Sequence, residues 1–114
     1  MTHKLVAVTA CISGVAHTYM AAERLETLCQ QLKWQLSIET QGALGVETPL
    51  APDAIAQADV VLLITDIEID GLARFDALRC VQVSTNLFLR EPNRVMNAVH
   101  KLMGSPSQTR LVLD

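Results

Sequence analysis

One cysteine lies where a strand-like apolar run meets a helix-like run. The stretch VTACISGVAHTYMAAERLE, residues 8–26, places Cys11 directly before a short Ser/Gly segment. A loop between a strand and a helix start presents unpaired backbone N–H groups, and the helix dipole adds to their attraction for anions. Gly14 can adopt backbone angles that side chains forbid, so the loop could curl around an oxyanion. A phosphoryl group suits such a cradle.

The same surroundings would activate the thiol of Cys11. Backbone N–H groups and the helix dipole favour the thiolate and lower the pKa of a cysteine. The thiolate could attack phosphorus and form a phosphocysteine whose oxygens are held by the N–H groups of residues 12–18. The role of His17 stays open between donating to these oxygens and holding a neighbouring loop. The candidate phosphate-binding residues beside Cys11 are Ile12, Ser13, Gly14, Val15, Ala16, His17 and Thr18.

The other cysteines, two histidines and an acidic segment are expected to have structural or surface roles. Cys29 falls on an apolar helix face and Cys80 in a strand, so both are expected to pack in the interior. His100 is expected to be solvated near a helix end, and His3 to be inert near the chain end. Residues 66–70, DIEID, lack the spacing of a calcium loop and predict an exposed acidic turn. Three cysteines without paired spacing predict neither disulfides nor a metal site.

Four strand-like runs must position the cysteine loop. Residues 4–10 and 59–65 are almost continuously apolar, as in central strands covered on both faces. Residues 35–40 and 79–84 alternate between polar and apolar side chains, which predicts half-buried strands at the sheet edges. Strands that alternate with helices predict a parallel sheet with right-handed crossovers.

The helical segments complete the predicted fold. Amphipathic helices are expected at about 17–33 and from 92 to about 103, a short helix over 52–58, and a turn or a single helical turn over 70–77. The fold class is therefore α/β: a three-layer sandwich with a four-stranded parallel sheet in the order 2-1-3-4, flavodoxin-like or Rossmann-like. Ligands of such sheets bind beyond the carboxyl ends of the strands. Cys11 is expected there, together with Gln41, Gly42, Asp66, Ser84 and Thr85.

The composition limits the function classes. The 114 residues, half of them apolar, predict one domain over residues 1–104, with 105–114 as a mobile tail or linker stub. A formal charge of −3 and scattered basic residues argue against nucleic-acid binding. The longest apolar run, residues 60–64, is too short to span a bilayer, and the N-terminus lacks the features of a signal peptide. We expect a cytoplasmic protein without direct membrane insertion and without a cofactor.

Four blocks, VTACISGVAHTYMAAERLE, IETQGALGVETPL, ADVVLLITDIEIDGLARF and VQVST, carry a resemblance over residues 4 to about 103. Together they resemble the fructose-type enzyme IIB family of the bacterial phosphoenolpyruvate-dependent sugar phosphotransferase system. The resemblance implies a cytoplasmic phosphotransferase that accepts a phosphoryl group from a phosphohistidine of a IIA partner onto Cys11. It further implies transfer to a fructose or fructose-like sugar bound by the membrane-embedded IIC partner, and a peripheral association with that permease.

The loop departs from the family pattern at one position. The family usually reads Cys-Pro-Thr-Gly-Ile-Ala-His-Thr, and this chain reads Cys-Ile-Ser-Gly-Val-Ala-His-Thr. Ser13 keeps the hydroxyl of the family's threonine. Ile12 in place of proline restores a backbone N–H and frees a torsion, so the loop could bind phosphate as well or better, yet be less preorganised.

Other functions use a similar thiol cradle. Low-molecular-weight tyrosine phosphatases and related arsenate reductases have a loop that resembles Cys-x5-Arg-Ser/Thr, but the sixth position after Cys11 is His17, and no Asp-Pro acid loop is present. A hydrolase needs a placed acid, so these differences favour transfer over hydrolysis. A non-catalytic anion-binding regulatory module of the same fold remains an alternative. A flavin-binding protein is disfavoured, because no aromatic pair occurs at the strand-end loops.

A docking surface is expected around the loop. An uncharged rim would exclude water and so protect a phosphoryl group during transfer. The rim residues are Ile12, Val15, Tyr19, Leu44 and Val46.

Overall fold

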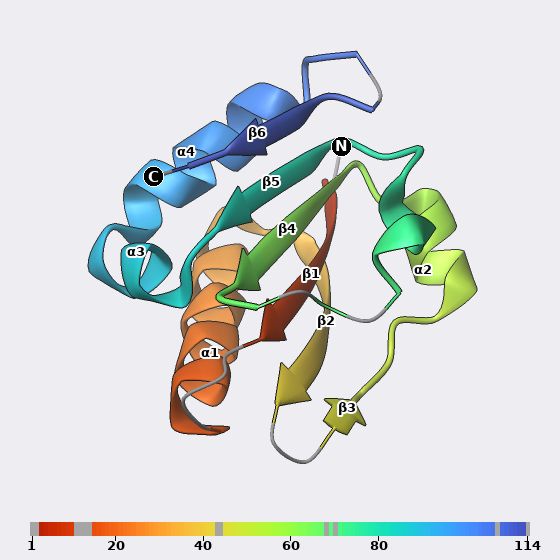
Figure 1. The fold of residues 1–114 in the computed structure, drawn as a ribbon. Helices are drawn as coiled ribbons and strands as arrows, with labels where there is room; N and C mark the ends of the chain where they lie inside the picture. The colour runs from red at the N-terminus through yellow and green to blue at the C-terminus, as the bar shows by residue number, and fades with distance from the viewer. Residues whose placement is uncertain are drawn as a thin grey trace.

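The protein is described here by a computed structural model, which covers residues 3–10, 15–42, 45–67, 69, 71–106 and 108–113. Figure 1 shows a central sheet with helices on both faces. In chain order the elements are β1 (Lys4–Ala10), α1 (Val15–Leu32), β2 (Gln35–Gly42), β3 (Gly45–Glu47), α2 (Pro52–Gln57), β4 (Val60–Thr65), the 3-10 helix η1 (Leu72–Phe75), β5 (Cys80–Val83), α3 (Thr85–Arg90), α4 (Pro92–Leu102) and β6 (Arg110–Val112).

The two most apolar strands, β1 and β4, are adjacent and parallel at the centre of the sheet. Their register runs from Leu5 opposite Val60 to Ala10 opposite Thr65. Every residue of β4 is buried, as is every residue of β1 after Lys4. Helices cover both faces here, so the near absence of polar side chains follows from burial on two sides. The predicted central pair is confirmed.

The sheet is larger than the sequence predicted. Five parallel strands lie in the order β2-β1-β4-β5-β6, and β3 adds an antiparallel strand beside β2. The prediction of four strands was therefore wrong, although the order of those four is as expected. The fifth parallel strand, β6, comes from residues 105–114, which were expected to form a mobile tail or linker stub. Both β2 and β5 were expected at edges, and each has an outer neighbour.

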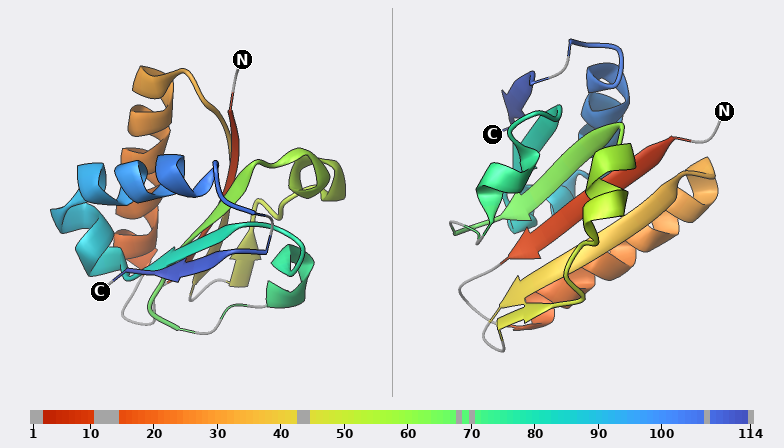
Figure 2. Two further views of the ribbon diagram at one scale, coloured as in Figure 1. Left: turned by 90° about the horizontal axis from the view of Figure 1, so that it is seen from above. Right: turned by 90° about the vertical axis from the view of Figure 1, so that its right-hand side faces the viewer.

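The helices form two layers. α1, α3 and α4 cover one face of the sheet, and α2 and η1 cover the other, as Figures 1 and 2 show. Alternate residues of β1 supply both cores: Leu5 and Ala7 face the first layer, and Val6 and Val8 the second. The predicted helices at about 17–33 and 92–103 correspond to α1 and α4 within two residues at each end.

Helix α3 was not expected from the sequence. It begins directly after β5, where the Ser84 hydroxyl oxygen accepts a hydrogen bond from the Leu87 N–H at 3.1 Å and so caps the helix start. Its buried residues Leu87 and Phe88 join the core beneath α1. Six residues are too few to show a helical period in the sequence, so this helix could not be predicted from the sequence pattern.

Candidate functional site

The candidate phosphate-binding loop connects β1 to α1. Cys11, Ile12, Ser13 and Gly14 lie outside the described residues. Residues 15–18 form the first turn of α1, but their side chains also lie outside the description. The roles assigned to these residues therefore stay predictions. The structure does describe the two elements on either side of them. β1 ends at Ala10 and α1 begins at Val15, so a strand is followed by a helix as the sequence predicted.

Two neighbouring strands border the end of β1. Gln41 of β2 lies opposite Ala10 on one side, and Thr65 of β4 lies opposite Ala10 on the other. The backbone N–H of Asp66 donates to the Ala10 carbonyl oxygen at 3.0 Å. The carboxyl ends of β1, β2, β4 and β5 point to one edge of the sheet in Figure 1. Five of the residues expected at this end of the sheet lie at or directly after these strand ends: Gln41, Gly42, Asp66, Ser84 and Thr85. The sixth, Cys11, lies outside the described residues.

Asp66 joins the connection after β4 to the start of α3. Its carboxylate accepts a hydrogen bond from the Thr85 N–H at 3.0 Å and another from the Thr85 hydroxyl at 2.5 Å. Thr85 is buried, whereas Asp66 is exposed. Asp66, the first acidic residue of the DIEID segment, thus binds the start of α3. The sequence had predicted only an exposed turn.

A buried carboxylate lies on β2, two residues before Gln41. Glu39 of β2 is 1% exposed and accepts four hydrogen bonds. The donors are Arg74 Nη1 at 2.8 Å, Arg74 Nη2 at 2.9 Å, Gln41 Nε2 at 2.7 Å and the Leu50 N–H at 3.0 Å. Burial alone would raise the pKa of Glu39, but these hydrogen bonds and the charge of Arg74 lower it to about 2. The carboxylate is therefore ionised at neutral pH.

Arg74 is held in one position by its surroundings. Its Nε donates to the Gly71 carbonyl oxygen at 2.7 Å, and its guanidinium carbon lies 4.8 Å from the centre of the Phe75 ring. Gly71 has φ of 76°, and a Cβ there would lie 2.6 Å from Arg74 Nε. The left-handed φ favours glycine here, and a side chain at this position would displace the Arg74 guanidinium. Hydrogen bonds to Glu39 raise the pKa of Arg74 further above its usual value.

Sequence reasoning missed this ion pair. The alternation in residues 35–40 assigned Glu39 to a polar, exposed side of the strand. In the structure Glu39 lies opposite Val8, so it faces the layer that contains η1. The sequence offers only an acidic residue on a strand and an arginine near a glycine. This combination is too common to predict a contact between residues that are 35 positions apart.

The other two cysteines are buried, as expected. Cys29 of α1 and Cys80 of β5 are each 2% exposed. Burial raises the pKa of Cys29 to about 11 and also raises the pKa of Cys80. Neither thiol is a nucleophile at neutral pH. Their predicted packing role is confirmed.

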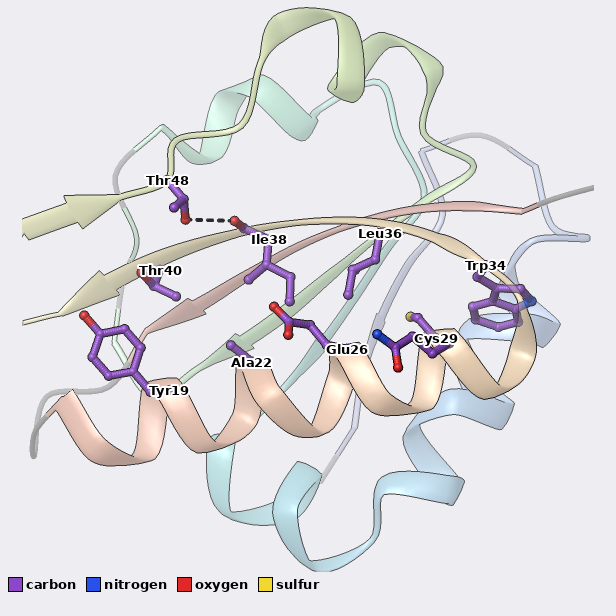
Figure 3. Close-up of a pocket in the computed structure, with 10 residues that line it drawn as sticks. Tyr19, Ala22, Glu26, Cys29, Trp34, Leu36, Ile38, Thr40 and Thr48 are labelled. Atoms are coloured by element: carbon purple, nitrogen blue, oxygen red, sulfur yellow. Dashed lines mark hydrogen bonds between the residues drawn. The ribbon is translucent and has the colours of Figure 1, made fainter.

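A groove of about 540 Å³ runs between α1 and β2. Figure 3 shows Trp34 at one end of it and Tyr19, Thr40 and Thr48 at the other, near the carboxyl end of β2. The Thr48 hydroxyl donates to the Ile38 carbonyl oxygen at 3.0 Å. Leu36 and Ile38 of β2 line the groove, and both are partly buried.

His3, Trp34 and His100 form a ring cluster at the opposite end of α1 from Tyr19. The ring centres lie 5.6 Å apart for His3 and Trp34, and 5.8 Å apart for the two histidines. His100 is exposed, as expected, while His3 packs against its neighbours. Within the described part of the chain, no group of three or more His, Cys, Asp and Glu side chains could hold a metal ion.

Comparison with known proteins decides the family. The model of the family described as "PTS system, Lactose/Cellobiose specific IIB subunit" matches residues 6–98. The chain belongs to the IIB family of the sugar phosphotransferase system. As a IIB protein it is a phosphotransferase component that carries a phosphoryl group, and the hydrolase and binding-module alternatives are not favoured.

Relatives of this IIB chain carry similar names. The "PTS system fructose-like EIIB component 3" of Escherichia coli K12 is 64% identical over 110 residues, which cover 96% of this chain and 97% of the relative. The "PTS system fructose-specific EIIB'BC component" of the same strain is 43% identical over 88 residues, which cover 77% of this chain and 16% of that longer protein.

Solved structures of IIB proteins have the same fold. The crystal structure named "Predicted Fructose Specific IIB from Escherichia Coli" is 63% identical, with a TM-score of 0.94 and complete coverage of both chains. A domain of a fructose-specific IIABC component from Borrelia burgdorferi is 37% identical, with a TM-score of 0.83, and covers 89% of this IIB chain and 96% of that domain. In the described part of the IIB chain, no helix has the length and apolar character needed to cross a membrane.

Proposed function

We propose that Cys11 is the phosphoryl acceptor of this IIB protein. The Cys11 thiolate attacks the phosphorus of a phosphohistidine on a IIA partner in line with the breaking P–N bond, and the imidazole leaves with the electron pair of that bond. The S–P bond then breaks when a sugar hydroxyl oxygen attacks, and the thiolate is regenerated. The hydroxyl proton leaves to a base outside this chain, so no proton is consumed on the thiol.

One observation carries the choice of Cys11. The family transfers a phosphoryl group, and of the three cysteines in the chain two are buried and have raised pKa values. Cys11 remains, at the junction between the carboxyl end of β1 and the start of α1. The backbone N–H groups of residues 12–18 would bind the transferring oxygens, with the hydroxyls of Ser13 and Thr18 as further donors.

The names of the relatives support a choice of sugar and partners. Relatives that are 64% and 42% identical are named fructose-like, so we assign a fructose or fructose-like sugar to this chain. The family description names lactose and cellobiose instead, but the fructose-like relatives cover 96% and 84% of this chain. The fused EIIB'BC relative supports a IIC permease as the acceptor partner, with this chain in the cytoplasm beside it.

The test is phosphorylation of the purified chain by a phosphorylated IIA protein of the fructose type. Mass spectrometry at neutral pH should find one phosphoryl group on Cys11, and the Cys11→Ser variant should accept none. Cys29→Ala is the control, because it removes a buried thiol and should leave labelling intact. Labelling of Cys11→Ser at the rate of the unsubstituted chain would overturn the assignment. An unmodified Cys11 would indicate an anion-binding module, and steady release of inorganic phosphate would indicate a hydrolase.

A further inference from the structure

Glu39 and Arg74 tie together two chain segments that border Ala10. Glu39 lies two residues before Gln41, which is opposite Ala10 in the sheet. Arg74 lies in η1, at the end of the connection that begins with Asp66, whose N–H donates to the Ala10 carbonyl oxygen. The bidentate ion pair between the two side chains therefore links β2, which borders Ala10 through Gln41, to η1, which follows the segment that begins with Asp66.

The pair is fixed in a single geometry. Arg74 donates through Nε, Nη1 and Nη2 to three different oxygens, at distances between 2.7 and 2.9 Å. The carboxylate of Glu39 binds the Gln41 amide through the same oxygen that accepts Arg74 Nη2. A planar guanidinium that forms two parallel bonds cannot rotate without breaking one of them. The orientation of the Gln41 amide and the place of η1 are thus determined together.

A stable fold does not require a buried ion pair at this place. Apolar side chains of similar volume often stabilise a fold as well as a buried ion pair does, because charged groups lose their hydration on burial. Apolar packing, however, does not fix an amide orientation. We propose that Glu39 and Arg74 are positioning residues for phosphoryl transfer, which fix the orientation of Gln41 beside Ala10 and the place of η1. This inference rests on the proposed role of Cys11 as acceptor.

The expected kinetic effect is on the maximum rate. The Glu39 side chain is 1% exposed and that of Arg74 is 29% exposed, so the pair contributes little surface to a docked partner. Loss of the pair would instead misplace groups around the loop, and a shift of about 1 Å near reacting atoms can lower a rate by roughly 100-fold. An effect confined to the maximum rate, with unchanged half-saturation by the donor, distinguishes positioning from docking.

Two variants and one control test the inference. Arg74→Lys keeps the charge and loses the bidentate contact. The double variant Glu39→Gln with Arg74→Met removes both charges and leaves an acceptor oxygen for the Leu50 N–H. Asp76→Asn is the control, since it removes an exposed ion pair with Arg110 just beyond η1. Rates of Cys11 phosphorylation are measured against the concentration of phosphorylated IIA, after circular dichroism confirms folding.

We expect Arg74→Lys to lower the maximum rate severalfold and the double variant to lower it by roughly 10- to 100-fold. The half-saturating IIA concentration should stay within about twofold in both, and Asp76→Asn should match the unsubstituted chain. If the double variant does not fold, Arg74→Lys alone decides the question. A folded variant with the full maximum rate, or a loss confined to half-saturation, would overturn the inference. Failure of the unsubstituted chain to label Cys11 would instead overturn the proposed function.

Discussion

At the residue scale, Glu39 illustrates how hydrogen bonds can outweigh the cost of burying a carboxylate. Its two oxygens accept four N–H donors, one of them a backbone group and two from a cation. Desolvation acts in the opposite direction and would raise the pKa, yet the net result is a pKa of about 2. The folded state therefore stabilises the ionised form of Glu39 relative to the protonated form.

This preference predicts an acid-dependent stability. The pKa of Glu39 falls from 4.5 to about 2 on folding, so its contribution is complete above about pH 5 and is lost as the pH falls toward 2. The contribution amounts to about 3 kcal/mol. In Glu39→Gln this dependence is absent. The difference in unfolding free energy between the two proteins should therefore shrink by about 3 kcal/mol between about pH 5 and pH 2 in urea titrations.

The matched control is Glu26→Gln, which changes an exposed carboxylate in α1 in the same way. Its stability should run parallel to that of the unsubstituted chain over the same pH range. A difference between Glu39→Gln and the unsubstituted chain that stays constant from pH 5 to pH 2 would show that Glu39 is not held as the structure indicates.

At the scale of elements, β6 shows that a strand can depend entirely on its neighbour. Its three residues pair in parallel with β5, with Leu111 opposite Val81. Leu111 and Leu113 pack against the main core, while Val112 points outward and is 62% exposed. A segment this short has no independent preference for a strand, so the unpaired edge of β5 and the apolar surface of α4 bring it into the sheet.

Replacement of Leu111 by alanine tests this packing. Because Leu111 is partly buried against the core, Leu111→Ala should lower the free energy of unfolding by about 1–2 kcal/mol. Val112→Ala is the control on the adjacent, exposed position and should change it by less than about 0.5 kcal/mol. Urea denaturation of both variants measures the difference. Equal effects at the two positions would contradict the packing of β6 on the core.

At the scale of the whole molecule, exposed apolar side chains occur at both ends of α1. Tyr19 is 39% exposed and Val46 of β3 is 42% exposed, both near the carboxyl ends of the strands. Leu32, at the far end of α1, is 46% exposed. Of the other predicted rim residues, Ile12 and Leu44 lie outside the described residues, and the side chain of Val15 is not described. The docking rim therefore stays a proposal, supported by two exposed positions.

Charged substitutions separate this rim from the rest of the surface. Tyr19→Glu and Val46→Glu should raise the half-saturating concentration of phosphorylated IIA by roughly tenfold, because a charge in a water-poor contact loses its hydration. Leu32→Glu and Val112→Glu, at equally or more exposed positions away from the rim, should leave it unchanged. Titrations of phosphorylation rate with IIA measure the effect. An equal change in the half-saturating IIA concentration for all four variants would contradict docking at this rim.

The sequence by itself determined the parts of this protein that depend on neighbouring residues. Continuous apolar runs identified the central strands, 3.6-residue periodicity identified α1 and α4, and the position of Cys11 between a strand and a helix suggested its chemistry. Four sequence blocks indicated the family. These signals are local, because each element must present an apolar surface of the right period before it can pack at all.

Only the tertiary structure decided how distant segments meet. It placed β6 beside β5, added β3 to the edge of β2, and turned Glu39 toward Arg74 across 35 residues of chain. Such contacts depend on which face of a strand is covered and by which element, and a polar residue in an alternating strand looks the same in sequence whether it meets water or an arginine. The physical reason is that burial of a charge depends on the availability of a partner, which the chain supplies only after it has folded.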